Sequence, residues 1–239
     1  MNSKCILIMF FCIFFHNKIV YAYDKLNILS EVYDDNRKTF LCNCEYESKK
    51  INYKKCNFYP KVNNKNAHNY TWVKLIKLKD YLKKYPEWKK GHDLCKTKKG
   101  KKFKKAKCVK RIYKKLFKEL NNDPHIYYPI IKQIAILIKD KKYRNIKNEK
   151  RKFGECNLEI NKKYIEPRDE VKGDIARTFQ YVSNKYVMEN AFSKKQNKIF
   201  NAWSKNDPID KWECKRSRLI ENKTGIKNNE LNLHCEKLK

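Results

Sequence analysis

Histidine is the side chain most often used for proton transfer near neutral pH, and one histidine of this sequence has a suitable neighbour. His125 follows Asp123 by two residues, a spacing at which the carboxylate could orient the imidazole ring to take a proton from water. The alternative is a structural role, which is the commoner one for an isolated histidine. His125 is therefore the candidate general base, ahead of His68, His92 and His234.

A dense run of basic residues offers a second kind of chemistry, the binding of phosphate groups. In residues 96–115, twelve of twenty residues are Lys or Arg and none is Asp or Glu. Such side chains neutralise phosphates without reading bases, so binding would lack sequence preference and weaken as salt rises. A solvated surface is the alternative interpretation of a charge run. The candidate nucleic-acid contacts are Lys98, Lys99, Lys101, Lys102, Lys104, Lys105, Lys107, Lys110, Arg111, Lys114 and Lys115.

The charge of the whole chain points the same way. It is formally +32, and loss of Lys4 and Lys18 with an N-terminal leader would remove two charges and leave +30. A charge of this size indicates polyanionic partners such as nucleic acid, anionic lipid or glycosaminoglycan. A codon composition rich in A and T, which favours Lys, Asn, Ile and Tyr, would account for part of it, so a protein partner stays open.

The first 22 residues have the composition of a secretory signal peptide. Lys4 precedes an apolar run over residues 5–15, and Val20-Tyr21-Ala22 supplies a cleavage signal. The run is shorter than the roughly 20 residues that a bilayer requires, and no later segment qualifies as a transmembrane segment. We therefore expect a protein of the secretory pathway, secreted or lumenal, with residues 23–239 as one domain and residues 23–38 as its N-terminal helix or arm.

Eight cysteines beyond the leader form an even set in a chain expected to reach an oxidising compartment. Four disulfides are expected, although eight cysteines allow 105 pairings and the sequence does not choose among them. A zinc site is the alternative, but the sequence contains no C-x₂-C pair. The eight are Cys42, Cys44, Cys56, Cys95, Cys108, Cys156, Cys214 and Cys235.

The elements that must position these groups are mostly helical. Apolar residues at helical spacing predict helices over residues 26–32 and 109–120. Alternating aromatics predict short strands and turns over residues 39–60. The apolar segment at residues 126–138 contains two polar residues and is typical of a buried core segment.

Three further helices are expected in the C-terminal third. The first begins near Lys172, and the second begins at Ser193, whose hydroxyl forms a capping box with Gln196. The third begins at Asp207-Pro208, an N-cap followed by proline, and ends at Gly225.

Five short motifs in this third follow one another in a distinctive order. They are Phe153-Gly154-Glu155-Cys156, Glu166-Pro167-Arg168, Gly173-Asp174-Ile175-Ala176-Arg177-Thr178, Phe200-Asn201-Ala202-Trp203 and Pro208-Ile209-Asp210-Lys211-Trp212-Glu213-Cys214. This order resembles the endonuclease I family, secreted or periplasmic enzymes that cut DNA and RNA without sequence preference. The resemblance is strong over residues 153–235 and weak over residues 39–152, where Cys42-Asn43-Cys44 is similar to the family's Cys-x-Cys.

The resemblance implies an α+β fold, a mainly helical domain with a small ββα-metal-like sheet region. The family holds one divalent metal, usually magnesium, with a Trp-Glu-His motif that supplies an acidic ligand and the general base, and with a later Asn. If the motif's Trp is Trp72, its acid falls on Val73 and its histidine on Lys74. The metal-binding Asn falls on Ala135. The resemblance therefore implies a degenerate site with no catalytic residue and no metal ligand.

The resemblance also implies four disulfides, one of them Cys95 with Cys108. The function expected from these observations is that of a catalytically inactive binding module for nucleic acid, another polyanion or a protein partner, with no cofactor. The alternative is an active, magnesium-dependent endonuclease whose site has been rearranged around His125.

Overall fold

The computed structural model describes residues 24–61, 65–147, 150–186 and 192–237. The predicted signal peptide, residues 1–22, lies outside this part of the chain. Within the described residues, no helix combines the length and the apolar character that crossing a membrane requires.

Runs of consecutive helices and several small sheets make up the regular structure, which confirms the α+β class. The helices are α1 (Lys25–Val32), α2 (Lys65–His68), α3 (Leu78–Leu82), α4 (Pro86–Lys89), α5 (Lys105–Ile112), α6 (Lys114–Asn122), α7 (Lys132–Ile138), α8 (Lys172–Lys185), α9 (Lys194–Asn206), α10 (Lys211–Thr224) and α11 (Asn229–Glu236), with 3₁₀ turns η1 (Pro124–Ile126) and η2 (Asp169–Val171). The strands are β1 (Tyr46–Glu47), β2 (Lys50–Ile51), β3 (Tyr70–Lys74), β4 (Tyr127–Ile131), β5 (Lys142–Tyr143), β6 (Glu159–Ile160) and β7 (Tyr164–Glu166).

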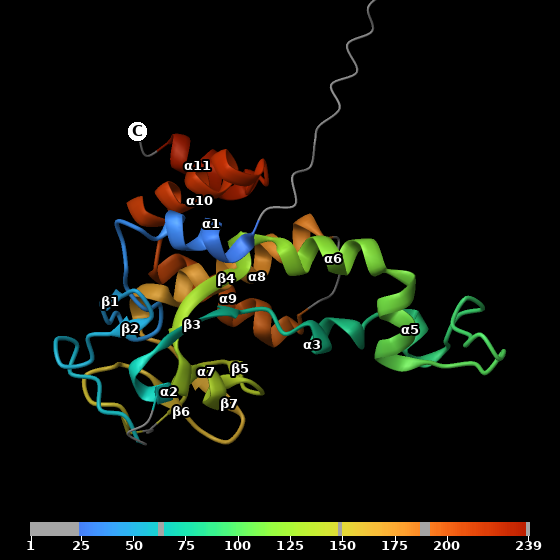
Figure 1. Cartoon of the computed structure of the whole chain (residues 1–239), viewed down its shortest axis with the longest axis horizontal. Helices are drawn as coiled ribbons and strands as arrows, with labels where there is room; N and C mark the ends of the chain where they lie inside the picture. Colours follow the sequence, from blue (N-terminus) through green and yellow to red (C-terminus); the bar gives the residue numbers. More distant parts are fainter. Residues whose placement is uncertain (1–23, 62–64, 148–149, 187–191, 238–239) are drawn as a thin grey trace, which may run out of the picture.

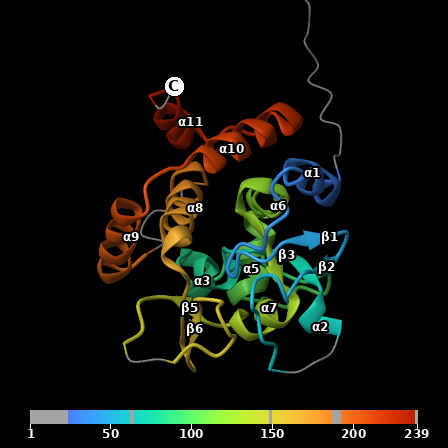
Figure 2. The same cartoon turned by 90° about the vertical axis from the view of Figure 1, so that its left-hand side faces the viewer.

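The strands of the described chain form small separate sheets. β1 pairs with β2 and β3 with β4, both antiparallel, and β7 lies between β5 and β6. Figure 1 shows the β3–β4 pair near the middle of the molecule, with α10 and α11 above α1 at one end and α5 toward the right. Figure 2, turned by 90°, shows α8 and α9 side by side and α7 beneath β3.

Two apolar clusters hold these elements together. The main cluster lies around β4, α7 and the C-terminal helices, and its fully buried side chains include Phe58, Phe153 and Phe200. A second cluster, which includes Val109 and Leu120, joins α3, α5 and α6 to α8. The predicted core segment over residues 126–138 is confirmed, because most of its apolar side chains are buried as β4 and α7.

Several helix signals in the sequence act as predicted. α8 begins at Lys172. Ser193 is the N-cap of α9 and accepts the N–H of Gln196 at 3.2 Å, whereas the Gln196 side chain donates to the carbonyl of Tyr143 and so completes no capping box. Gly225 ends α10 in the left-handed conformation, with φ of 71°, which glycine adopts without strain.

The predicted start of α10 at Asp207-Pro208 is wrong. α10 begins at Lys211, where Asp210 is the N-cap and accepts the N–H of Glu213 at 2.7 Å. Asp207 instead closes α9, and its Oδ2 accepts the N–H of Gly173 at 2.7 Å. Its cap-like residue type serves a contact between helices rather than a helix start.

The single helix predicted over residues 109–120 is also wrong in part, because it divides into α5 and α6 at Tyr113. The Tyr113 ring packs on Tyr85 with 4.3 Å between ring centroids, and its hydroxyl donates to Glu87 at 3.1 Å. Packing against the α4 region thus overrides the helical periodicity.

Four disulfides join the eight cysteines, as predicted, and the Cys95–Cys108 bridge is confirmed. Two others are also local in sequence, while Cys42–Cys156 spans 114 residues and ties the N-terminal segment to the start of the C-terminal third. The remaining bridges are Cys44–Cys56 and Cys214–Cys235.

A buried guanidinium joins α10 to the central β3–β4 pair. Arg216 is 6% exposed, and its donors lie within 3.2 Å of the Tyr33 hydroxyl and of the carbonyl oxygens of Pro124, His125 and Tyr127. These carbonyls belong to the turn η1 and the first residue of β4. Arg216 therefore fixes where β4 begins relative to the C-terminal helices.

We predict that Arg216→Met lowers the free energy of unfolding by about 3 kcal/mol or more, because it leaves several buried carbonyl oxygens without a donor. Urea unfolding of the oxidised protein measures this change. Arg218→Met is the matched control, since Arg218 is exposed on the same helix, and it should change the free energy by no more than about 0.5 kcal/mol. Equal effects of the two substitutions would refute the structural role of Arg216.

Candidate functional site

The paired strands β3 and β4, with α7, form the ββα unit that the resemblance predicts. Trp72 lies opposite Pro129 in an antiparallel register, so the strand with the aligned Trp72 pairs with the strand that leads into α7. α7 begins immediately after β4 and contacts both strands. Val73, Lys74 and Ala135 therefore all belong to one structural unit.

The three side chains do not converge on one point. Val73 and Lys74 are neighbours on a paired strand, so their side chains point to opposite faces. Val73 and Ala135 both pack against the main core cluster. These two positions therefore share an apolar face of the ββα unit, and Lys74 lies on the other face.

Lys74 belongs to a group of basic side chains around Asn121, which we call the Lys74 cluster: Lys25, Lys74, Lys110 and Asn121. Lys74 Nζ donates to Asn121 Oδ1 at 2.5 Å, and Lys25 Nζ donates to the Asn121 carbonyl at 2.8 Å. Burial, followed by the charges of Lys25 and Lys110, lowers the pKa of Lys74. Among the described residues, no carboxylate pairs with these ammonium groups. An anion bound here would offset their repulsion.

This environment does not fit a divalent cation. The side chains of Val73 and Ala135 carry no oxygen, the atom type that magnesium requires. The Lys74 ammonium would repel a metal ion on the face of the β3–β4 pair to which Lys74 projects. Across the part of the chain that the structure describes, no three His, Cys, Asp or Glu residues are grouped so that they could hold a metal ion.

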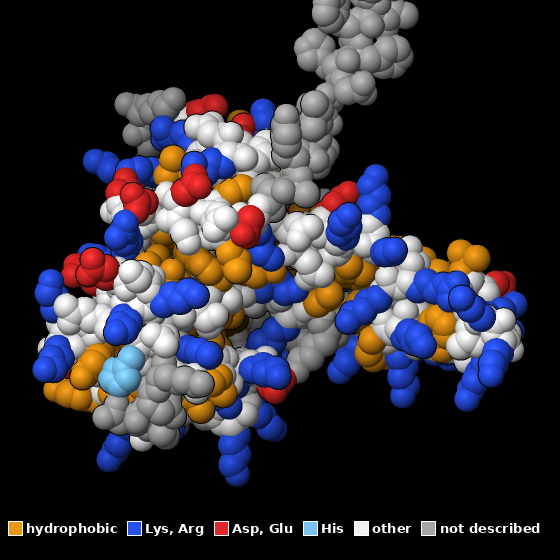
Figure 3. Space-filling view, viewed as in Figure 1, with side chains coloured by type: hydrophobic (Ala, Val, Ile, Leu, Met, Phe, Trp, Pro, Cys, Tyr) orange, Lys and Arg blue, Asp and Glu red, His pale blue; other side chains and the backbone are white. Residues whose placement is uncertain are grey.

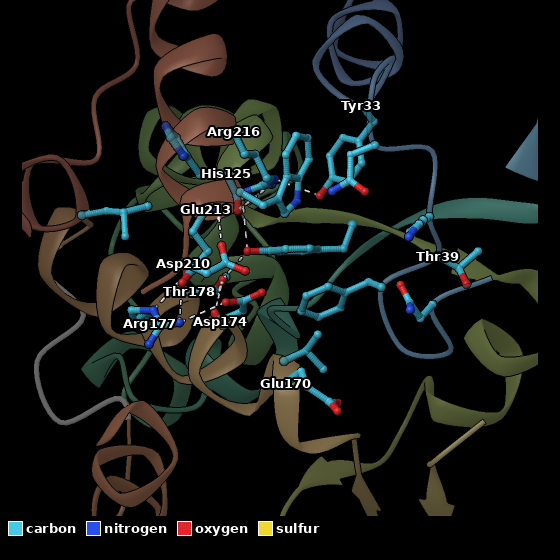
Figure 4. A pocket seen from close by; sticks show the side chains of 18 of the residues that line it. Tyr33, Thr39, His125, Glu170, Asp174, Arg177, Thr178, Asp210, Glu213 and Arg216 are labelled. Carbon is cyan, nitrogen blue, oxygen red and sulfur yellow. Dashed lines mark hydrogen bonds and ion pairs between the residues drawn. The ribbon is translucent and has the colours of Figure 1, made fainter. Parts of the chain in front are cut away.

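His125 is a buried residue of η1, with 3% of its surface exposed. Its Nε2 lies 3.0 Å from the carbonyl oxygen of Ile226, so Nε2 carries the proton and Nδ1 is the unprotonated nitrogen. Burial lowers the pKa of His125 to about 4. The ring is neutral at pH 7, as a general base must be, but it is almost fully buried and lines only the small polar cavity of Figure 4.

Asp123 does not orient this ring, contrary to the sequence-based expectation. Its Oδ1 accepts the backbone N–H of His125 at 2.9 Å, which caps η1. Its Oδ2 accepts the hydroxyl protons of Tyr181 and Tyr186. The carboxylate, fully buried, is thus committed to joining η1 to α8.

Three of the five motifs that carry the family resemblance, those at residues 166–168, 173–178 and 208–214, contribute to a small polar cavity of about 90 Å³, shown in Figure 4. Arg177 makes a two-pronged ion pair with Glu213 and also donates to Asp174 at 3.0 Å. Burial and the nearby Glu213 raise the pKa of Asp174 well above its usual value. Because the groups are paired with one another, their evident role is to join α8 to α10.

The predicted nucleic-acid contacts lie on a projecting segment that we call the basic arm, residues 95–115. It consists of a loop closed by the Cys95–Cys108 bridge, then α5 and the start of α6. Figure 3 shows Lys and Arg side chains projecting from it at the right of the molecule. All eleven predicted contacts are exposed, and no described carboxylate lies within ion-pair distance of them.

The sequence did not single out Lys25 or Asn121. They come from α1 and the end of α6, far from Lys74 along the chain, and no local spacing links them. Lys110 was predicted as a contact of the basic arm, and its charge also acts on Lys74. The Lys74 cluster therefore borders the base of the basic arm.

Comparison with known proteins agrees with this arrangement. The profile of the family described as Endonuclease I matches residues 31–230. An endonuclease-1 of Buchnera aphidicola subsp. Acyrthosiphon pisum is 29% identical over 231 residues, which cover 94% of this chain and 86% of the relative. Two proteins of Aeromonas hydrophila, an extracellular and a periplasmic deoxyribonuclease, are 27% and 25% identical, and each match covers 87% of this chain and 87% and 84% of the relative. The chain belongs to the endonuclease I family.

Proposed function

We propose that this chain is a catalytically inactive member of its family, a pseudoenzyme that binds nucleic acid through its phosphates. The observation that carries the proposal is the pair of Val73 and Ala135 on the apolar face of the ββα unit, with Lys74 on the other face. Hydrolysis by a single metal needs oxygen ligands and a base that reaches water. The side chains at these positions supply neither.

The same replacements favour binding. An ammonium group attracts a phosphate where a metal-assisted site would need a ligand or a base. The Lys74 cluster lies beside the base of the basic arm, so a polyanion could contact both. Contacts of this kind carry no sequence information, so we expect binding to DNA and RNA alike.

Two other readings are open. In an active nuclease, His125 would be the base, but it is enclosed and its one protonated nitrogen is bonded to Ile226. In a purely protein-binding role, the basic arm would meet an acidic partner. The relatives named extracellular and periplasmic support our proposal that residues 1–22 are a leader and that the chain is secreted. The single family match over residues 31–230 supports our proposal that residues 23–239 form one domain.

We predict that the oxidised protein does not cleave plasmid DNA or RNA, with or without magnesium. Lys74→His alone should restore no cleavage, because ligands and base act as a unit. Val73→Glu, Lys74→His and Ala135→Asn together return the side-chain types of the family's motif, but residues 73 and 74 project to opposite faces of β3, so this variant should show no more than a trace of cleavage. A plasmid-nicking assay with and without a chelator measures this, and chelator-sensitive cleavage by the unmodified protein that His125→Ala abolishes would establish the nuclease reading instead.

We predict that reversing four charges on the basic arm weakens nucleic-acid binding and its salt dependence. In the variant, Lys101, Lys102, Lys104 and Lys105 become Glu. Each phosphate contact that is lost should reduce the slope of log affinity against log salt by about 0.7–0.9. Fluorescence anisotropy with a labelled duplex, at several salt concentrations, measures both quantities.

The matched control for the arm variant reverses four lysines at the opposite end of the molecule (Figure 1). They are exposed residues around the β1–β2 turn: Lys49, Lys50, Lys54 and Lys55. Both variants lose the same net charge, so only a local contact can separate them. Equal losses of affinity would mean that the charge acts without a defined binding surface.

We predict opposite effects of Lys74→Gln on stability and on binding. The lowered pKa of Lys74 means that folding disfavours its charged form, so the free energy of unfolding should hold or rise when glutamine replaces it. In the unmodified protein, the same argument makes stability increase as pH rises through the lowered pKa of Lys74. Affinity for nucleic acid should fall. Urea unfolding and anisotropy test this, and a variant that is less stable but binds normally would make Lys74 a structural residue.

A further inference from the structure

A cavity distinct from both the polar cavity of Figure 4 and the Lys74 cluster combines aromatic walls with a basic rim. Its volume is about 330 Å³, and it lies between α3, β5, α8 and α9. Five rings line it: Tyr81, Tyr143, Phe179, Phe192 and Phe200. None of the described residues that line it is acidic.

The rings form one continuous group. Phe192 is partly exposed and packs edge-to-face on Phe179 and Phe200, with 5.5 Å between centroids in both pairs. It also meets Tyr81 edge-on at 6.0 Å. Phe200 and Tyr81 are buried behind it, at 2% and 3% exposure. Phe192 thus offers ring surface to an incoming group while the other rings support it.

The rim is cationic. Lys83 and Lys84 follow α3, and Lys142 begins β5. All three are exposed, and no carboxylate whose side chain the structure describes pairs with them. Phosphate groups that flank a bound base would find these ammonium groups at the mouth of the cavity.

Polar groups at the wall favour a heterocycle over a hydrocarbon chain. Gln196 Nε2 donates to the Tyr143 carbonyl at 3.2 Å, which holds the amide at the wall with its oxygen still able to accept. The Ser193 hydroxyl lies beside it. An alkyl chain would cover these groups without bonding to them, which is unfavourable. The volume also lies at the small end of the range for ligand sites, as expected for one base with its sugar.

The cavity lies within reach of the Lys74 cluster. Lys77, one of its lining residues, follows Lys74 by three positions, and three residues of extended chain span at most about 11 Å. A strand whose phosphate rests on the Lys74 cluster could therefore place a nearby base in the cavity.

We infer that this cavity holds one unpaired nucleobase of a single-stranded nucleic acid by stacking against Phe192, with the lysine rim on its flanking phosphates. This inference rests on the proposed binding of nucleic acid and adds a preference for strands with accessible bases. Because every base has a stacking face, the preference does not depend on sequence.

The test compares two ten-nucleotide strands of equal charge, oligodeoxyadenylate and an abasic strand, on the oxidised protein. Stacking of one base should make the adenylate strand bind about 5- to 150-fold more tightly. Phe192→Ala should bring this ratio close to one and leave affinity for the abasic strand unchanged. Tyr59→Ala is the control, because Tyr59 is an exposed ring (65%) that does not line the cavity, and it should keep the ratio.

If Phe192→Ala does not fold, Phe192→Leu takes its place, since leucine fills the apolar space but cannot stack; it should also lose the preference. Equal binding of both strands by the unmodified protein overturns the base site and leaves the proposed function standing. Failure to bind either strand overturns both. The inference also falls if Tyr59→Ala removes the preference and Phe192→Ala does not, or if oleate occupies the cavity without displacing adenylate.

Discussion

The burial of the Arg216 guanidinium is the constraint on which the arrangement of the ββα unit depends. A buried cation must have its donors satisfied, and here the carbonyl oxygens of η1 and β4 satisfy them instead of a carboxylate. The β3–β4 pair therefore cannot shift relative to α10 without exposing either the Arg216 guanidinium or the carbonyl oxygens that it bonds. The positions of Lys74 on β3 and Ala135 on α7 follow from this fixed strand pair.

This architecture separates what holds the fold from what performs chemistry. Buried charged residues that could serve chemistry are committed to structure: Arg177 with Glu213, both in motifs of the family resemblance, and Asp123 with two tyrosines. A scaffold held by such contacts does not need ligands at the ββα unit in order to fold. Loss of a metal site can therefore leave the fold intact while residues at the surface are replaced by charged ones, which agrees with the Lys74 cluster beside the β3–β4 pair.

Much of the fold could be predicted from the sequence, since it follows from local signals. Ser193 and Gly225 act at helix ends as their types indicate, and the family resemblance anticipated the ββα unit and the Cys95–Cys108 bridge. The errors occurred where distant contacts override local signals. Asp207 has the type of an N-cap but bonds to Gly173 on another helix, and Tyr113 interrupts a helix by packing on Tyr85.

The candidate site was harder to predict for the same reason. Lys74 was identified through the family motif, but its partners Lys25 and Asn121 come from other elements, and no spacing in the sequence connects them. The aromatic cavity likewise collects rings from α3, β5, α8 and α9. A cavity built from four elements depends on how they pack, whereas sequence periodicity describes each element alone.

The Cys42–Cys156 bridge imposes an order on oxidative folding. During synthesis from the N-terminus, Cys42 becomes available together with Cys44 and Cys56, and its own partner follows 114 residues later. Every early pairing of Cys42 is therefore a wrong one that a later thiolate must undo. Oxidative folding of this chain thus avoids disulfide exchange only if Cys42 stays reduced until Cys156 is available; otherwise exchange is a slow step that depends on the redox couple or isomerase at hand.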